Sequence, residues 1–242
     1  MLDDWLVTRV RAANRAYRRP TRTETTRAVA ALKAVLAGHP PDLTDLPLQL
    51  TRGTDTLLAD THADGPGWGA LALRETTTLL IEVPHPGSDR LTARLGLDLF
   101  HAIPTAALLV AGAHRDVVDV AHRTDTIFHA FAQTLATTEI QLHGFAAASA
   151  PDTDAIVSPG AGRVTELHHV LKKTLTRQGF RVHHHEHLAG RTNAQGIASA
   201  ARGTPFLHLE LAPLLRLHHR HAVVEAVANT WHQQGHHQKP DE

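Results

Sequence analysis

Short apolar runs alternate with amphipathic stretches along the chain from about residue 67 onward. The apolar runs have the length and composition of β-strands, and the stretches between them place apolar residues on one face of a helix. Strands that alternate with helices build a sheet of mainly parallel strands between two layers of helices. The sequence therefore predicts an α/β fold with a mixed, largely parallel sheet and helices on both faces. We expect strands at 69–74, 78–83, 106–111, 139–143, 155–158, 179–184 and 205–211.

The first 66 residues have a different pattern. Apolar residues at helical spacing predict two helices, the first around Val10 and the second around Leu32. The rest of this segment is polar and irregular, which is typical of a loop with one short strand near Leu57. We therefore expect an N-terminal helical segment over 1–66, packed on an α/β domain over 67–242.

The composition limits the classes of partner. The chain has 242 residues, and no apolar run reaches the ~18 residues of a membrane helix. The first residues lack the basic start and apolar core of a signal peptide, which favours a cytoplasmic location. A formal net charge of zero gives no general attraction to nucleic acid or to a membrane surface. We expect a small-molecule or peptide-like substrate, and the lack of cysteine excludes thiolate metal sites.

Histidine is unusually abundant, with 21 residues, many of them in clusters. The simplest interpretation of the clusters is solvated surface histidine. Adventitious metal binding and a pH switch near the intrinsic pKa of ~6.5 are the alternatives. Single polar residues at the ends of predicted strands are therefore the better candidates for a functional site.

Two predicted strands each carry a titratable residue near their end. His143 ends the run that starts at Ile140, and Glu210 lies near the end of the run that starts at Phe206. Side chains alternate along a strand, so these two residues face away from the leucines beside them. A carboxylate in a strand made for burial is costly unless it has a partner. Ligands of open α/β sheets bind beyond the carboxyl ends of the strands, where both residues fall.

A third polar group follows the predicted strand at 78–83. The turn after it contains His85 and Asp89. A catalytic zinc site uses three N or O ligands and keeps one position open for water. His85, Asp89 and His143 form such a set, which predicts one Zn²⁺ ion. Glu210 is then the expected general base, which takes a proton from the metal-bound water.

Each of these residues also has a structural interpretation. His85 could simply be a histidine in a loop. His143 could be a core histidine whose hydrogen bonds are satisfied. Asp89 could instead cap the helix that follows it. Glu210 could form a buried salt bridge with Arg191 or Arg123.

Two further stretches supply the expected substrate contacts. Arg123 lies in a polar stretch, where its guanidinium could bind a substrate carboxylate or stabilise an oxyanion. His114 and His122 of the same stretch compete for a metal-ligand role. Arg191 and Asn193 lie in the loop before the last predicted strand, where substrate contact and a turn or cap role are both consistent with the sequence.

The order of these motifs resembles that of the zinc-carboxypeptidase-like amidohydrolases, with N-formylglutamate amidohydrolases and phage-type poly-γ-glutamate hydrolases nearest in pattern. The motifs are Pro84–Asp89, Asp119–Arg123, Leu142–Gly144, Gly190–Asn193 and Leu207–Leu211. The resemblance covers roughly residues 67–215 and implies a phosphorylase/hydrolase-like fold.

The resemblance also implies roles for single residues. A His and an acid of the first motif and a His of the later strand bind zinc in that superfamily, which points to His85, Asp89 and His143 here. A Glu of the last strand is the general base, which points to Glu210. The chain departs from the pattern in two places. Its acid is an Asp four residues after the histidine, where carboxypeptidases have a Glu three residues after it, and His122 stands where the superfamily often has an Asn before the Arg.

These observations predict a zinc-dependent amidohydrolase that acts on a small acylated amino acid or a γ-glutamyl-type linkage. The alternative is a non-catalytic module on the same fold, which binds a carboxylated ligand or a partner protein. The departures at Asp89 and His122 favour that alternative. A histidine-based acid sensor is a third, weaker hypothesis.

Overall fold

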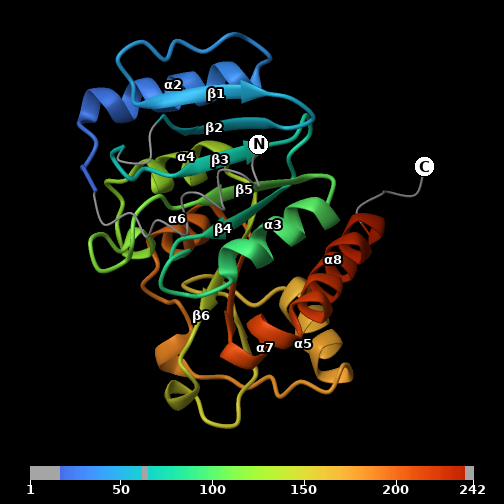
Figure 1. Cartoon of the computed structure of the whole chain (residues 1–242). Helices are drawn as coiled ribbons and strands as arrows, with labels where there is room; N and C mark the ends of the chain where they lie inside the picture. Colours follow the sequence, from blue (N-terminus) through green and yellow to red (C-terminus); the bar gives the residue numbers. More distant parts are fainter. Residues whose placement is uncertain (1–16, 62–64, 238–242) are drawn as a thin grey trace.

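One eight-stranded sheet organises the described part of the chain, which comprises residues 17–61 and 65–237 of a computed structural model (Figure 1). The strands lie in the order β1-β2-β3-β5-β4-β6-β8-β7. Their bounds are Leu48–Arg52 (β1), Thr56–Asp60 (β2), Ala70–Leu73 (β3), Leu79–Val83 (β4), Ala106–Val110 (β5), Thr138–Gly144 (β6), Ala155–Ser158 (β7) and Phe206–Leu211 (β8).

The centre of the sheet is parallel and its edges are antiparallel. β4 pairs in parallel with both β5 and β6, and β6 pairs in parallel with β8. β1, β2 and β3 on one edge and β7 on the other run antiparallel to their neighbours. The predicted mixed α/β sheet is confirmed. Its parallel centre brings the carboxyl ends of β4, β6 and β8 to the same edge, where ligands of such sheets bind.

Helices cover both faces of the sheet, as predicted. α3 (Thr92–Ala102), α5 (Glu166–Arg177) and α8 (Arg220–His237) share one apolar core with the sheet. α2 (Arg22–Leu36) and α4 (Ile127–Leu135) share a second core on the opposite face. α6 (Ala194–Arg202) packs against α4 and β8, and α7 (Pro213–His218) follows β8 directly.

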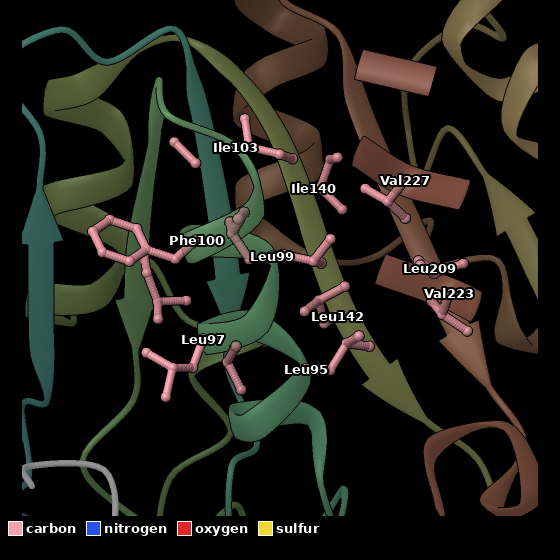
Figure 2. Close-up of a cluster of buried hydrophobic side chains, with 14 of the residues drawn as sticks. Leu95, Leu97, Leu99, Phe100, Ile103, Ile140, Leu142, Leu209, Val223 and Val227 are labelled. Atoms are coloured by element: carbon pink, nitrogen blue, oxygen red, sulfur yellow. The ribbon is translucent and has the colours of Figure 1, made fainter. Parts of the chain in front are cut away.

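The core beneath α3 and α8 fixes which way β6 and β8 face. Figure 2 shows side chains of the sheet packed with those of the two helices: Ile140, Leu142 and Leu209 with Leu95, Leu99, Val223 and Val227. All of these side chains are fully buried. Burial of one leucine or isoleucine contributes ~1.5–3 kcal/mol, so this face sets the register of the strands. The residues between them must therefore face the other side of the sheet.

Two predicted elements differ from the structure. Residues 179–184, expected to be a strand, form only an isolated bridge between Val182 and Ala155. The strand prediction is wrong because Val182 alone is buried there, between a left-handed Gly179 and exposed histidines. The short strand expected near Leu57 is β2, but residues 48–52, expected to be loop, form a further strand, β1, which pairs with it.

The N-terminal segment is only partly described. The predicted helix around Leu32 is α2, whose N-terminus is closed by a capping box between Thr21 and Glu24. The predicted helix around Val10 lies outside the described residues. The boundary predicted at residue 66 falls between β2 and β3, which are adjacent strands of the same sheet. No helix in the described ranges combines the length and the apolar character needed to cross a membrane.

Candidate metal centre and active site

The three parallel strands that meet at one edge carry a layer of buried polar side chains. The layer faces away from the core of Figure 2, as the alternation in the sequence predicts. Its members are Glu82 of β4, Glu139, Gln141 and His143 of β6, and His208 and Glu210 of β8. The register places Gln141 beside His208 and His143 beside Glu210. The pairing of β6 with β8 thus brings His143 and Glu210 together.

The structure also brings together the three predicted metal ligands. His85 and Asp89 lie in the turn after β4, and both are buried. Asp89 Oδ2 lies 3.4 Å from His85 Nδ1 and 3.4 Å from His143 Nδ1. Ligand atoms of a tetrahedral zinc ion are about 3.3 Å apart, given zinc–ligand distances of ~2.0–2.1 Å. The described part of the chain therefore contains a His-Asp-His group of the size that a zinc ion needs.

Hydrogen bonds at the far side of each imidazole leave the Nδ1 atoms available. His85 Nε2 lies 2.7 Å from Asp119 Oδ1, and His143 Nε2 lies 2.9 Å from Gln141 Oε1. His85 Nδ1 is buried and has no hydrogen-bond partner. Metal-binding histidines typically donate their second ring N–H to a carboxylate or carbonyl in this way. The donor set and its outer hydrogen bonds thus fit a zinc ion.

The electrostatics agree with this arrangement. Burial alone raises the pKa of Asp89, but His143 and His85 hold the pKa of this carboxyl well below its usual range. Burial lowers the pKa of His143 to about 4, so its imidazole is neutral at neutral pH. For His85 burial lowers the pKa, but Asp119 and Asp89 together raise it above the ordinary value. The raised pKa favours a proton on both nitrogens of His85. A cation that binds at His85 Nδ1 must therefore displace the proton there.

Asp89 does not cap the following helix. The N-cap residue of α3 is Leu91, which has a left-handed conformation with φ of 71° and makes no side-chain cap. Asp89 Oδ2 instead accepts a hydrogen bond of 3.1 Å from the backbone N–H of Gly144. This bond links the turn after β4 to the end of β6, so both ligand-bearing segments are joined at the site.

Glu210 lies beside the three residues with one carboxylate oxygen free. Glu210 Oε2 is buried without a hydrogen-bond partner, and Oε1 is 4.0 Å from His208 Nε2. Burial, together with the charge of Asp89, raises the pKa of Glu210 to about 8. The buried salt bridge that the sequence left open is not formed, because neither Arg191 nor Arg123 contacts Glu210. A buried carboxyl with one oxygen free of hydrogen bonds and a raised pKa is a candidate general base.

A cavity of about 570 Å³ opens above the site. His85, Asp89, His143, His208 and Glu210 form its floor. Its walls come from the ends of β6 and β8 and from the loops on either side. The wall residues with polar side chains are Arg115, His122, Ser149, Glu186, His187, Arg191, Thr192 and Asn193.

Solved structures share this architecture. A bacteriophage poly-γ-glutamate hydrolase matches with a TM-score of 0.52 over 67% of this chain and 87% of that chain, at 16% identity. The chain therefore has a fold similar to that of this hydrolase. The resemblance seen in the sequence is confirmed at the level of the fold.

Two other solved structures match less well. An N-formylglutamate amidohydrolase from Ralstonia eutropha JMP134 has a TM-score of 0.48 at 15% identity, over 69% of this chain and 96% of that chain. A metallo-carboxypeptidase from Pseudomonas aeruginosa has a TM-score of 0.46 at 11% identity, over 90% of this chain and 70% of that chain. No protein-family model and no curated protein sequence matches the chain.

The structure places the three predicted substrate residues differently within this carboxypeptidase-like fold. Arg191 lines the cavity, where it pairs with Glu186 at 2.5 Å. Asn193 also lines it, but its side-chain amino group donates to Gln141 Oε1. Arg123 is not among the lining residues, because its guanidinium donates to both carboxylate oxygens of Asp125 at 2.8 and 2.6 Å.

His114 and His122, the competing candidates from the sequence, belong to no group with metal-ligand spacing among the described residues. His114 lies 3.1 Å from Ser88 Oγ, and His122 lies between Asp119 and Thr192. In the described ranges, a second group with metal-ligand spacing consists of His143, His208 and Glu210, and it shares a residue with the first. The clusters at 168–169, 183–187 and 218–221 contribute to neither group.

Arg216 is a buried cation that joins the segments of the site, and the sequence did not reveal it. Arg216 of α7 is buried and donates to the backbone carbonyls of Leu211, Arg90 and Phe145. These carbonyls lie at the end of β8, after the turn of His85 and at the end of β6. A Cβ at residue 144 would collide with this guanidinium, which explains the glycine there. No local pattern distinguishes Arg216, because its three acceptors are backbone groups far apart in the sequence.

Proposed function

We propose that the chain is a zinc-dependent amide hydrolase that acts on a small acylated amino acid or on a γ-glutamyl-type linkage. The proposal rests on one juxtaposition: His85 Nδ1, Asp89 and His143 Nδ1 converge beside the unpartnered carboxyl of Glu210 in one cavity. A buried carboxylate that faces two imidazole nitrogens has poor compensation unless a proton or a cation lies between them. The metal-ligand roles of these three residues follow from that need.

Each residue has a distinct task in this proposal. His85, Asp89 and His143 would hold a Zn²⁺ ion, which supplies Lewis acidity that polarises a carbonyl oxygen and makes water a stronger nucleophile. Glu210 accepts the proton of the attacking water and passes it to the leaving amine. A nearby cation lowers the pKa of Glu210 from about 8, so that the basic carboxylate exists at neutral pH.

The cavity wall favours an anionic substrate. Arg115 lines the cavity, and its side chain is 41% exposed although it contacts Asp119 at 3.1 Å. We propose that it takes the role that the sequence suggested for Arg123, because its Nη1 lies 3.9 Å from the carboxylate of Asp89. Arg191 and Asn193, which also line the cavity, remain proposed substrate contacts. N-acyl amino acids and γ-glutamyl amides both carry a free carboxylate that a guanidinium binds well. The name of the phage hydrolase of similar fold agrees with a γ-glutamyl substrate.

Metal analysis combined with hydrolysis tests the proposal. Tag-free protein, loaded with Zn²⁺ and desalted, should retain one ion per chain and release amine from N-acylglutamates or γ-glutamyl amides. His143→Ala should lose the ion, and Glu210→Gln should keep the ion but lose hydrolysis. Absence of stoichiometric zinc, or unchanged zinc in His143→Ala, contradicts the metal assignment.

The surface histidines provide the matched control. Replacing His183, His184 and His185 by alanine removes two exposed histidines and one half-buried histidine, none of which lines the cavity. This triple variant should bind zinc as the wild type does. Zinc loss in the triple variant but not in His143→Ala would show that the ion sits on the surface. Thermal stabilisation by glutamate that is unaffected by a chelator would support a binding module in place of a hydrolase.

A further inference from the structure

Gln141 lies in the polar layer directly behind a proposed zinc ligand. Its side chain is fully buried on β6, two residues before His143 on the same face. Gln141 Oε1 lies 2.9 Å from His143 Nε2 and also accepts a hydrogen bond from the Asn193 amino group. Gln141 Nε2 donates to Glu82 Oε2 at 2.8 Å and to Gln195 Oε1 at 3.2 Å. All four hydrogen-bonding positions of this amide are therefore filled by four neighbouring side chains.

A backbone carbonyl determines which atoms donate and which accept in these hydrogen bonds. Gln195 Nε2 donates to the carbonyl oxygen of Val120 at 3.1 Å, and a carbonyl can only accept. Gln195 Oε1 must then be the atom that faces Gln141, so Gln141 presents its amino group there. Gln141 Oε1 consequently faces His143 Nε2 at 2.9 Å, a contact that requires a proton on this nitrogen, whereas the Asn193 amino group lies farther from it, at 3.4 Å.

The opposite orientation of Gln141 is unfavourable. A flipped amide would place its oxygen against Gln195 Oε1. It would also place its amino group against that of Asn193. Each contact would leave a buried polar atom facing a like atom, at a cost of ~1–3 kcal/mol. Gln195 and Asn193 therefore select one orientation.

We propose that Gln141 is a positioning residue that fixes His143 in the Nε2-protonated tautomer, with its orientation set through Gln195 by the carbonyl of Val120. The Nδ1 lone pair of His143 is thereby aimed at Asp89, 3.4 Å away. This inference rests on the proposed function for its purpose, since a metal needs that lone pair. The tautomer itself is a property of the metal-free chain and can be measured without any ion.

The two proposed histidine ligands differ in this respect. His85 is oriented by the carboxylate of Asp119, whereas His143 is oriented by a neutral amide. An amide adds no negative charge behind His143, in a layer that already contains Glu82 and Glu139. Burial, followed by the charge of Glu139, raises the pKa of Glu82 well above its usual range, so a further carboxylate there would be costly.

Nitrogen-15 NMR of the histidine rings in metal-free protein tests the inference. Wild-type His143 should be the Nε2–H tautomer, and Gln141→Met should shift it toward Nδ1–H, because Asp89 then offers the better acceptor. Zinc affinity, measured by competition with a chromophoric chelator, should fall 10–100-fold in Gln141→Met. Gln195→Met should shift the His143 tautomer less, in the same direction. It keeps Gln141 beside His143 and removes only the contact that fixes the orientation of the Gln141 amide.

Two comparisons separate positioning from loss of stability. Ser199→Ala removes a buried hydrogen bond to Glu139 in the same polar layer, 2.7 Å long, without touching His143. It should leave both the tautomer and the zinc affinity unchanged. Gln141→Glu keeps an acceptor oxygen toward His143 and should retain the Nε2–H tautomer if it folds.

The outcomes distinguish this inference from the proposed function. Zinc that fails to bind wild type contradicts the metal site, while the tautomer of the metal-free protein still decides the role of Gln141. An Nδ1–H tautomer in the wild type, or an unchanged tautomer in folded Gln141→Met and Gln195→Met, overturns the inference even if zinc binds.

Discussion

The two faces of β4, β6 and β8 are opposite in character although they share the same strands. One face carries Ile140, Leu142 and Leu209 into a dry core against α3 and α8 (Figure 2). The other carries six buried polar residues, of which Glu82 Oε1, His208 Nδ1 and Glu210 Oε2 have no hydrogen-bond partner. Unsatisfied buried groups are costly, so the polar face lowers stability where the apolar face raises it.

This difference separates stability from chemistry within each strand. A residue that faces the core is expected to affect the free energy of unfolding and to leave the site intact. The residue next to it in the sequence is expected to affect metal binding or catalysis. Sites of this kind are commonly supported by stability generated elsewhere in the fold.

The largest effect is expected at Glu210 on the polar face. Glu210→Gln should lower hydrolysis 10²–10⁴-fold, because it removes the only proposed general base. Zinc binding should persist. Glu225→Gln, an exposed position on α8, is the matched control and should keep full activity. Retained hydrolysis in Glu210→Gln would remove that residue from its role.

The apolar face should respond through stability. Leu142→Ala truncates a fully buried side chain and should lower the free energy of unfolding by ~2–5 kcal/mol. Zinc affinity of the folded variant should stay near that of the wild type. Chemical denaturation together with chelator competition measures both quantities. Leu217→Ala, at an exposed position on α7, should change neither. Loss of zinc affinity in folded Leu142→Ala would show that the two faces are not separable.

Arg216 should affect both quantities, because it ties the ends of β6 and β8 to the turn of the first motif. Arg216→Met should destabilise the protein by ~1.5–3 kcal/mol, the range for hydrogen bonds from a charged donor. It should also weaken zinc binding severalfold, because the ligand-bearing segments lose their common anchor. Arg216→Lys keeps the charge but not the fork of donors, and should recover little of the affinity. Full recovery by lysine would mean that charge, and not the three bonds, is what matters.

The last effect is spread over several pH units and concerns the metal-free protein. The folded-state pKa of Glu210 is about 8, above the ordinary value of 4.5. The folded form keeps a proton that the unfolded chain releases, so stability is lost as pH rises from about 4.5 to about 8. Relative to Glu210→Gln, the wild type should lose up to about 1 kcal/mol per pH unit in that window. Bound zinc should make the difference in stability between the wild type and Glu210→Gln less dependent on pH, because a nearby cation lowers the pKa of Glu210. A pH-independent difference without metal would contradict the raised pKa.

The sequence was most informative where burial enforces a strict period. The alternation along 140–144 and 206–211 predicted which side of β6 and β8 is polar, because a slip by one residue would expose every leucine. His85, Asp89, His143 and Glu210 could be placed near one another because parallel strands end at one edge. The edge strand β1 was missed because one of its faces is exposed and carries no apolar repeat.

The outer contacts of the site could not be read from the sequence. Gln141 was visible as the neighbour of His143 on the same face, but its bonds to Gln195 and Glu82 depend on how α6 and β4 pack. The choice of Arg123 over Arg115 depended on loop conformation, for which no periodic signal exists. Arg123 is held by Asp125, only two residues away, and Arg115 is the one that reaches the cavity.

A crystal structure of the zinc-loaded protein, with anomalous diffraction at the zinc edge, tests the central claim most directly. One anomalous peak is expected about 2.0–2.2 Å from His85 Nδ1, His143 Nδ1 and a carboxylate oxygen of Asp89. Glu210 should lie beside the ion without binding it. A peak held by His208 and Glu210, or no peak within the cavity, would contradict the account.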